Sequence, residues 1–338
     1  MSKINKNLSL TKPFLLKPAG RDSLWGGSTL KNDFNKEIDM TPLAETWECS
    51  THPNGLSTIA SGKFYGATLK SFIKKHPEIL GTNVKSRDGS IPILVKFIDA
   101  KEQLSVQVHP SDEYAKEHER GQKGKTEMWY VVGATKDATL TYGFKRNVSE
   151  ETVRKGLETG SIERYMNKVQ VHKNDVFLVE AGTIHAIGAG CLIIEVQESS
   201  DLTYRLYDFN RVDKNGNKRK LDIEKGLQVL NRKAINPPKQ PIRVLRYTNG
   251  MASESIISCP FFQVERLLVN TQESRKMATF QSKVNSFEVL TCYYGCGSIT
   301  YGRNNTSFNF FKGDTIFVPA NSIPIKIHGR ASFIKVHC

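Results

Sequence analysis

The sequence predicts an all-β-dominated protein made of two β-barrels of one kind, with short helical insertions around them. Alternating apolar and polar residues, which are typical of strands, occupy residues 90–145, 168–200 and 243–338, with Gly, Asn and Pro between the runs. Residues Lys173–His185 also align without gaps with Lys312–Pro324, and Leu140–Gly143 matches Ile299–Gly302 upstream of that segment. An internal repeat of this kind indicates two copies of one structural unit.

The proline-rich stretch Asn236–Pro241 is the natural linker between the two copies. We therefore expect a first domain over residues 1–240, with an N-terminal extension and the helical insertions, and a second domain over residues 241–338. A chain of 338 residues allows two cores, and 38% hydrophobic with 24% charged residues is an ordinary globular composition. Six cysteines without a framework spacing, and no recognisable signal peptide, predict a reduced, cytoplasmic setting.

Helical periodicity is confined to three short segments. Each has apolar residues spaced three or four apart, so that they lie on one face of a helix. The segments contain Leu69, Phe72 and Ile73 before His76-Pro77; Val153 and Leu157 after Ser149, a candidate N-cap; and Ile223, Leu227 and Leu230.

The first repeat carries a candidate metal site. In the run Val106–His109, side chains alternate between the two faces of a strand, so Gln107 and His109 lie on the same face. Burying these two polar side chains costs free energy unless a partner such as a metal satisfies them. Glu127 begins the apolar run that follows it, and His185 comes after a strand and a glycine-containing turn. Two imidazoles, a carboxylate and an amide oxygen suit zinc, with iron, manganese and cobalt as alternatives. In the second repeat Pro324 replaces His185, so only the first barrel is expected to bind metal.

The net charge of +14 is the unusual feature of the composition. The basic residues are spread along the chain, and the densest cluster, Lys214–Lys220, is centred on an Asn-Gly turn that predicts a solvated hairpin tip. No zinc-finger, RNP or helix-turn-helix pattern accompanies the charge, so we expect small anionic substrates and no nucleic-acid partner. No apolar run approaches the roughly 18 residues of a membrane span, and we expect no membrane partner.

With these residues in hand, the chain resembles a type I mannose-6-phosphate isomerase of the short bacterial form, a member of the cupin (jelly-roll) superfamily. The order of the candidate ligands is that of a metal-binding cupin barrel. The resemblance covers nearly the whole chain, and its motifs are Ala44–Ser50, His52–Gly55, Leu94–Asp99 and Gln107–Pro110. It implies one Zn²⁺ per chain in the N-terminal barrel, held by Gln107, His109, Glu127 and His185.

The resemblance also implies the reaction, which is the interconversion of mannose 6-phosphate and fructose 6-phosphate through a cis-enediol intermediate. The partner is then a small sugar phosphate, and the chain is expected to be a monomer or a homodimer. Glu195 and Arg205 follow His185 at intervals of ten residues, a spacing that the family shares and that places the arginine in the active site.

The same reasoning assigns roles to the polar residues around the metal. We expect Arg205, Glu195 and Lys125 to be catalytic and Lys96, Arg211 and His52 to bind substrate. Glu195 or His52 is the candidate proton shuttle, Lys125 can polarise an oxygen, and Arg205 matches phosphate or enediolate oxygens. Longer family members carry a Thr-Pro-Lys segment where this chain has Leu206–Arg211, which makes Arg211 the candidate replacement for that lysine.

Three alternatives stay open at this point. An Fe(II) cupin dioxygenase also uses His and carboxylate ligands, but such barrels usually open with His-x-His and place the carboxylate a few residues later. Here the first position is Gln107, and Glu127 lies 18 residues after His109. A non-catalytic sugar-phosphate-binding bicupin would keep the metal ligands and lose the proton shuttle. Nucleic-acid binding would rest on charge alone.

Overall fold

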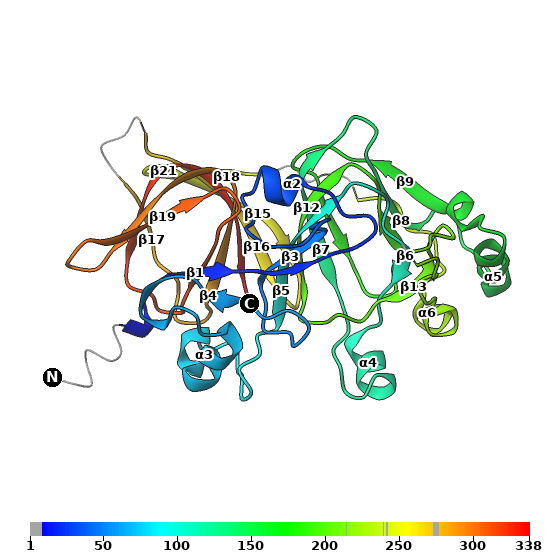
Figure 1. Ribbon diagram of the computed structural model, residues 1–338, viewed down its shortest axis with the longest axis horizontal. Coiled ribbons are helices and arrows are strands. Elements are labelled where there is room, and N and C mark those ends of the chain that lie inside the picture. Colours follow the sequence, from blue (N-terminus) through cyan, green and yellow to red (C-terminus); the bar gives the residue numbers. More distant parts are fainter. Residues whose placement is uncertain (1–8, 214, 239, 241–242, 273–276) are drawn as a thin grey trace.

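The computed structural model describes residues 9–213, 215–238, 240, 243–272 and 277–338. Antiparallel strands dominate it, which confirms the predicted β class. Two strand-rich halves lie side by side, and Figure 1 shows the candidate metal-binding strands in one half and the C-terminal strands in the other. Among the described residues, no helix is long and apolar enough to cross a membrane.

The first half consists of two sheets that enclose the candidate metal ligands. Its central strands β5 (Ile93–Ala100) and β12 (Cys191–Glu198) are mostly apolar, and all their residues except Leu192 are buried. The six-stranded sheet has the order β10-β7-β12-β5-β3-β2, and the five-stranded sheet has the order β13-β6-β11-β8-β9. The remaining strands of the first sheet are β2 (Ala19–Arg21), β3 (Glu45–Cys49), β7 (Glu127–Ala134) and β10 (Val176–Val179); the second contains β6 (Val106–Val108), β8 (Thr139–Phe144), β9 (Met166–Gln170), β11 (His185–Ile187) and β13 (Tyr204–Tyr207).

A ten-stranded sheet forms the second half. Its strand order is β14-β15-β16-β21-β18-β20-β1-β4, with β17 paired to β21 and β19 paired to β18. The strands are β1 (Phe14–Lys17), β4 (Thr58–Ile59), β14 (Arg246–Thr248), β15 (Met251–Ser258), β16 (Gln263–Asn270), β17 (Ala278–Phe280), β18 (Glu288–Tyr301), β19 (Thr306–Phe311), β20 (Thr315–Val318) and β21 (Ile325–His337).

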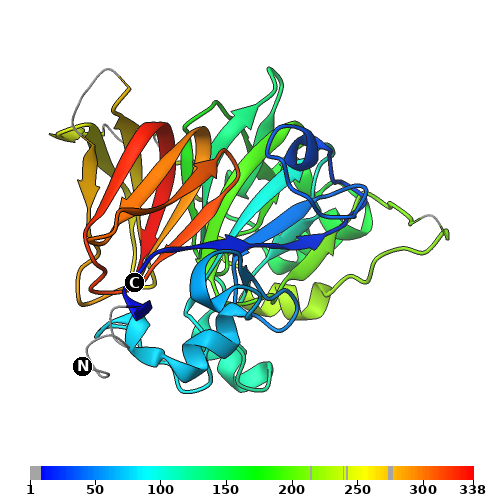
Figure 2. The same ribbon diagram turned by 60° about the vertical axis from the view of Figure 1, so that its left-hand side comes forward.

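The N-terminal segment links the two halves. Leu15 of β1 pairs with Ile316 of β20, whereas the next strand, β2, pairs with β3 of the first half. Figure 2 shows this first, blue part of the chain crossing from one half to the other. The predicted domain boundary at residue 240 stays a prediction, because β1 and β4 add to the second sheet and part of the predicted linker (residues 239 and 241) lies outside the described residues.

The internal repeat is confirmed by the backbone. Strands β10 and β20 begin and end at equivalent positions of the two repeat copies. Asn174 and Gly313, which align in the repeat, have φ of 75° and 101°, and the aligned Gly182 and Asn321 have φ of 85° and 51°. Gly and Asn are the residues that enter this left-handed region most readily, so the same two turns are built twice.

The three predicted helices form, and they lie at the periphery of the two halves (Figure 1). They are α3 (Leu69–Lys75), α5 (Glu150–Glu158) and α6 (Ile223–Val229), and the Ser149 side chain accepts a hydrogen bond from the Thr152 amide as the N-cap of α5. Two helices were not predicted, α2 (Thr29–Asn32) and α4 (Asp112–His118). Their only buried side chains are Leu30 and Ala115 respectively, so neither has an apolar face that periodicity could reveal. Short 3-10 turns cover Gly62–Phe64, Pro77–Leu80 and Ile162–Tyr165.

The contact between the halves is largely apolar and contains one buried ion pair. A single apolar cluster includes Phe97 from β5 and Phe317 from β20. Within it, Lys36 Nζ lies 2.6 Å from Glu48 Oε1, and Thr315 of β20 donates to the other oxygen of Glu48. The first half, with the candidate metal ligands, is therefore packed firmly against the second.

Candidate metal centre

Three strands of the first half bring the candidate ligands together. Gln107 lies on β6, and His109 follows directly after that strand. His185 is the first residue of β11 and pairs with Gln107 across the sheet, whereas Glu127 is the first residue of β7 in the opposite sheet. The ligand atoms of His109, Glu127 and His185 all lie within 4.8 Å of one another. The structure therefore contains a possible metal-binding triad, with Gln107 beside it.

Both imidazoles are oriented by backbone carbonyls. His109 Nδ1 lies 2.8 Å from the carbonyl oxygen of Leu202, and His185 Nδ1 lies 2.8 Å from that of Thr183. A carbonyl only accepts, so each Nδ1 carries the proton and each Nε2 has a free lone pair. Both Nε2 atoms face Glu127, which is the arrangement found when a histidine binds a metal and its second nitrogen is held by the protein.

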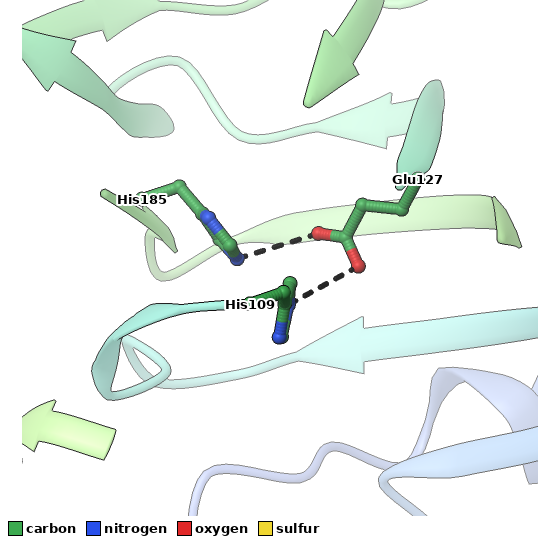
Figure 3. Close-up of side chains that lie close together, drawn as sticks. All are labelled: His109, Glu127 and His185. Carbon is green, nitrogen blue, oxygen red and sulfur yellow. Dashed lines mark ion pairs between the residues drawn. The ribbon is translucent and has the colours of Figure 1, made fainter. Parts of the chain in front are cut away.

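Each imidazole lies at a distance typical of two ligands of one small cation from a different oxygen of Glu127. His185 Nε2 is 3.3 Å from Oε1, and His109 Nε2 is 3.4 Å from Oε2, as Figure 3 shows. Two ligand atoms about 2.0–2.1 Å from a tetrahedral zinc are roughly 3.4 Å apart. Among the described residues, His109 Nε2 and Glu127 Oε1 are buried without a hydrogen-bond partner, whereas Glu127 Oε2 has the Lys125 ammonium at 2.9 Å. Buried polar atoms are rarely left in this state, so the triad is chemically incomplete without a cation.

Gln107 completes the donor set from the side of β6. Its Nε2 lies 3.2 Å from His185 Nε2. The amide oxygen and nitrogen are exchanged by a half-turn of the group, so the oxygen can take the same position and face a cation. The residues present therefore fit a divalent metal with two nitrogen and two oxygen ligands.

The electrostatics of the triad favour a metal over a proton. Burial, reinforced by the charge of Lys125, lowers the pKa of His109 to about 3, and burial also lowers the pKa of His185. Burial alone would raise the pKa of Glu127, but the charge of Lys125 and the contact with His109 outweigh it and hold this pKa well below its usual range. Two neutral imidazoles and an ionised carboxylate are the protonation states that metal binding requires.

A polar cavity of about 440 Å³ adjoins the triad. Gln107 and Lys125 line it, and Lys125 Nζ lies 2.9 Å from Glu127 Oε2. Burial lowers the pKa of Lys125, but the carboxylates of Glu127 and Glu195 reverse this effect and raise it, so the ammonium stays charged. The other predicted residues that line the cavity are Lys96, Glu195 and Arg205.

Two carboxylates share one lysine on the floor of this cavity. Lys96 Nζ lies 3.1 Å from Glu195 and 3.7 Å from Glu45. Trp129 donates its indole N–H to Glu195, and Trp47 donates to Glu45. The strand register explains the arrangement, because Glu195 on β12 is opposite Lys96 on β5 and Trp129 on β7. Burial and then the charge of Glu127 raise the pKa of Glu195.

Arg205 lies beside the candidate ligand Gln107 on the five-stranded sheet. It is opposite Gln107 in the pairing of β13 with β6, so both side chains are on the same face. Its Nε donates to the Ser105 hydroxyl, and its Nη1 donates to the Lys220 carbonyl.

The structure does not place His52 and Arg211 among the residues that line this cavity. The His52 ring packs edge-on against Trp47 at 5.7 Å, and burial lowers its pKa. Arg211 instead donates to Asp208 and to the Gln103 carbonyl. Their predicted contacts with substrate stay predictions.

Several cavity residues were given no role from the sequence. Glu45 and Trp47 alternate on β3, and that alternation was a usable signal because the two side chains share a face. Arg219 belongs to the cluster 214–220, which was interpreted as a solvated tip. Residues 215–218 are exposed as expected, but Arg219 folds back onto Asp208 and lines the cavity.

Comparisons with known proteins agree with this geometry. Residues 14–136 match the sequence model of the family described as "Phosphomannose isomerase type I, catalytic domain". The chain is 34% identical to mannose-6-phosphate isomerase of Streptococcus mutans over 97% of its own length and 99% of that protein. It is also 34% identical to mannose-6-phosphate isomerase ManA of Bacillus subtilis, with the same coverage. A crystal structure of the mannose 6-phosphate isomerase from Bacillus subtilis superposes with a TM-score of 0.87 at 30% identity, covering 96% of this chain and 99% of that one.

Proposed function

Because the chain belongs to the type I mannose-6-phosphate isomerase family, we propose that it is a zinc-dependent enzyme that interconverts mannose 6-phosphate and fructose 6-phosphate. One observation carries the metal dependence of this proposal. The buried ligand atoms of His109, Glu127 and His185 converge, and His109 Nε2 and Glu127 Oε1 lack a hydrogen-bond partner among the described residues. The three residues lie beside a cavity lined by charged side chains.

The reaction moves a proton between C2 and C1 and exchanges a proton between the two oxygens, with a cis-enediol between substrate and product. Gln107, His109, Glu127 and His185 would hold the zinc. When bound, the ion would act as a Lewis acid that stabilises negative charge on the substrate oxygens. The other steps fall to side chains of the cavity.

Glu195 is the candidate that moves the carbon-bound proton. Its carboxyl group lines the cavity and is fixed by the Trp129 indole and Lys96. A carboxylate whose pKa is raised toward the working pH is a better base than an ordinary one. In this role Glu195 takes the proton from C2 and returns it to C1.

The cationic groups stabilise the oxygens. Lys125 remains protonated because its carboxylate neighbours raise its pKa, so it can donate a hydrogen bond to a substrate oxygen. Lys96 keeps Glu195 in place from the opposite strand. Arg205 presents a guanidinium group next to Gln107, where it can pair with an anionic part of the substrate.

The experiment is a coupled isomerase assay on mannose 6-phosphate, run on protein as purified, after chelation, and after zinc is added back. Metal content is measured by mass spectrometry in each state. Activity that is lost on chelation and restored by zinc supports the proposal. Folded, zinc-loaded protein without isomerase activity contradicts it and favours the non-catalytic sugar-phosphate-binding bicupin; iron with oxygen uptake would instead indicate a dioxygenase.

A further inference from the structure

We propose that the phosphate group of the substrate is bound by the guanidinium pair Arg205 and Arg219, and that Asp208 is the positioning residue that directs Arg219 into the cavity. This inference rests on the proposed function, because it takes the ligand to be a sugar 6-phosphate. It deepens that function by naming the residues that recognise the phosphate.

Arg219 is held by one edge of its guanidinium group. Its Nε donates to Asp208 Oδ2 at 2.8 Å, and its Nη2 donates to Oδ1 of the same carboxylate. The side chain also lines the 440 Å³ cavity. No hydrogen bond from Nη1 to another described residue is found, so this nitrogen is available to a ligand. A two-point contact with Asp208 fixes the plane of the group, which reduces the entropy lost on binding.

Arg205 faces the same part of the cavity. Ser105 and the Lys220 carbonyl hold its Nε and Nη1, while Nη2 has no hydrogen-bond partner among the residues that the structure describes. Burial lowers the pKa of Arg205, and the charge of Arg219 lowers it further, so the two cations are close enough to repel each other. Neighbouring cations that keep unpaired N–H donors and outnumber the carboxylates around them form a binding site for an anion.

The charge balance around Asp208 matches a phosphate monoester. Arg205, Arg211 and Arg219 surround this one carboxylate, which leaves an excess of two positive charges. A second carboxylate that acts on Arg205, that of Asp222, is paired with Lys220 at 3.3 Å. A phosphate monoester carries close to two negative charges at neutral pH, so it would neutralise the cluster.

Arg211 differs from Arg219 in where its donors point. Its three nitrogens contact the Asp208 side chain, the Asp208 carbonyl and the Gln103 carbonyl. It also lies 5.3 Å from the centre of the Phe209 ring and does not line the cavity. Arg211 therefore holds Asp208 from outside the cavity, and Arg219 is the arginine that reaches the ligand.

The position of Arg205 and Arg219 relative to the candidate metal ligands suits a ligand with two chemically different ends. Gln107 is opposite Arg205 in the strand pairing, and Ser105 precedes Gln107 by two residues on the same face. The candidate ligand Gln107 and Arg205 thus share one face of the sheet, and Arg219 lines the same cavity. A sugar phosphate carries its reacting carbons at one end and its phosphate at the other, so the two ends can be recognised separately.

The test compares Arg219→Gln with Arg211→Gln and with Arg154→Gln. Arg154 is also paired with a carboxylate, Glu224, but lies on α5. For Arg219→Gln we expect KM for mannose 6-phosphate and the inhibition constant of inorganic phosphate to rise about tenfold or more, with kcat within about threefold. Arg211→Gln should raise both constants less, and Arg154→Gln should leave them unchanged. An unchanged KM in Arg219→Gln, or an equal effect of Arg211→Gln, overturns the assignment.

Two further measurements keep the inference separate from the proposed function and from folding. If the zinc-loaded wild type does not isomerise mannose 6-phosphate, binding of inorganic phosphate is measured by calorimetry instead. If the wild type binds inorganic phosphate and Arg219→Gln does not, the result supports the phosphate site even without isomerase activity. If the wild type does not bind inorganic phosphate, the assignment is overturned. Thermal unfolding is used to check that the Asp208→Asn variant is folded. This variant should have a raised KM and an unchanged kcat; a fall in kcat with unchanged KM contradicts a positioning role.

Discussion

Replacement of Glu195 by Gln tests the proposed proton transfer most directly, because the chain contains a matched control. Glu195 and Glu45 both flank Lys96 Nζ, at 3.1 Å and 3.7 Å, and each accepts a hydrogen bond from a tryptophan indole. They differ in their relation to the candidate metal. Glu195 is two residues from Gln197, which pairs with Glu127. Glu195 is therefore the carboxylate that lies beside the triad.

The expected effect is large on turnover and small on stability. Gln keeps an oxygen that can accept from Trp129, and Lys96 keeps Glu45 as a partner. The free energy of unfolding should therefore fall by about 1–3 kcal/mol at most. Loss of a general base lowers kcat by about 10²–10⁴-fold, which corresponds to roughly 3–5 kcal/mol of activation free energy.

The assay measures kcat and KM, together with exchange of the substrate C2 proton with solvent deuterium by NMR. In Glu195→Gln both turnover and exchange should fall by at least about 100-fold, while bound zinc and KM stay close to those of the wild type. In Glu45→Gln we expect less than about tenfold loss of turnover. The reasoning is refuted if zinc-loaded Glu195→Gln turns over within tenfold of the wild type, or if Glu45→Gln is the more impaired variant.

Two predictions concern stability. Lys36→Met removes the ammonium group that lies 2.6 Å from the buried carboxylate of Glu48, and it should lower the free energy of unfolding by about 3–5 kcal/mol. A loss under about 1 kcal/mol in urea unfolding would contradict this prediction. The double variant that also carries Glu48→Gln should recover much of the loss. Burial raises the pKa of Glu198 from 4.5 to about 7, so the folded state keeps a proton that the unfolded chain releases, and wild-type stability should fall as pH rises through this window. The hydrogen bond from the Thr126 amide favours the ionised carboxylate and limits the effect, and Glu198→Gln should be more stable than the wild type by about 1–2 kcal/mol at pH 8. The difference should shrink toward pH 5, and an equal difference at both pH values would rule out this titration.

Local patterns were sufficient for much of the fold. The residues of β10 and the position of Glu127 at the start of β7 follow from continuous apolar runs, and the start of α5 follows from the Ser149 cap. These features depend on neighbours within a few residues. The repeat was visible for the same reason, since its turns need Gly or Asn at the same two positions of each copy.

Strand partners and side-chain directions depend on residues that are distant in the sequence, so local patterns could not predict them. β1 pairs with β20, near the other end of the chain, and no local pattern in either strand specifies that partner. Arg211 and Arg219 both contact Asp208, and nothing in their local sequence says which one faces the cavity. That choice is made by how the loop around them packs.

The sequence by itself determined the strand-rich class, the repeat, the family and the candidate ligands, because alternation, turn chemistry and motif order are properties of short segments. The tertiary structure alone decided where the ligand atoms point. The carbonyls of Leu202 and Thr183 orient the two imidazoles, and a shared Lys96 joins the carboxylates of β3 and β12. Such contacts form only when separate strands reach their register, since the free energy that orients each side chain comes from groups far away in the chain.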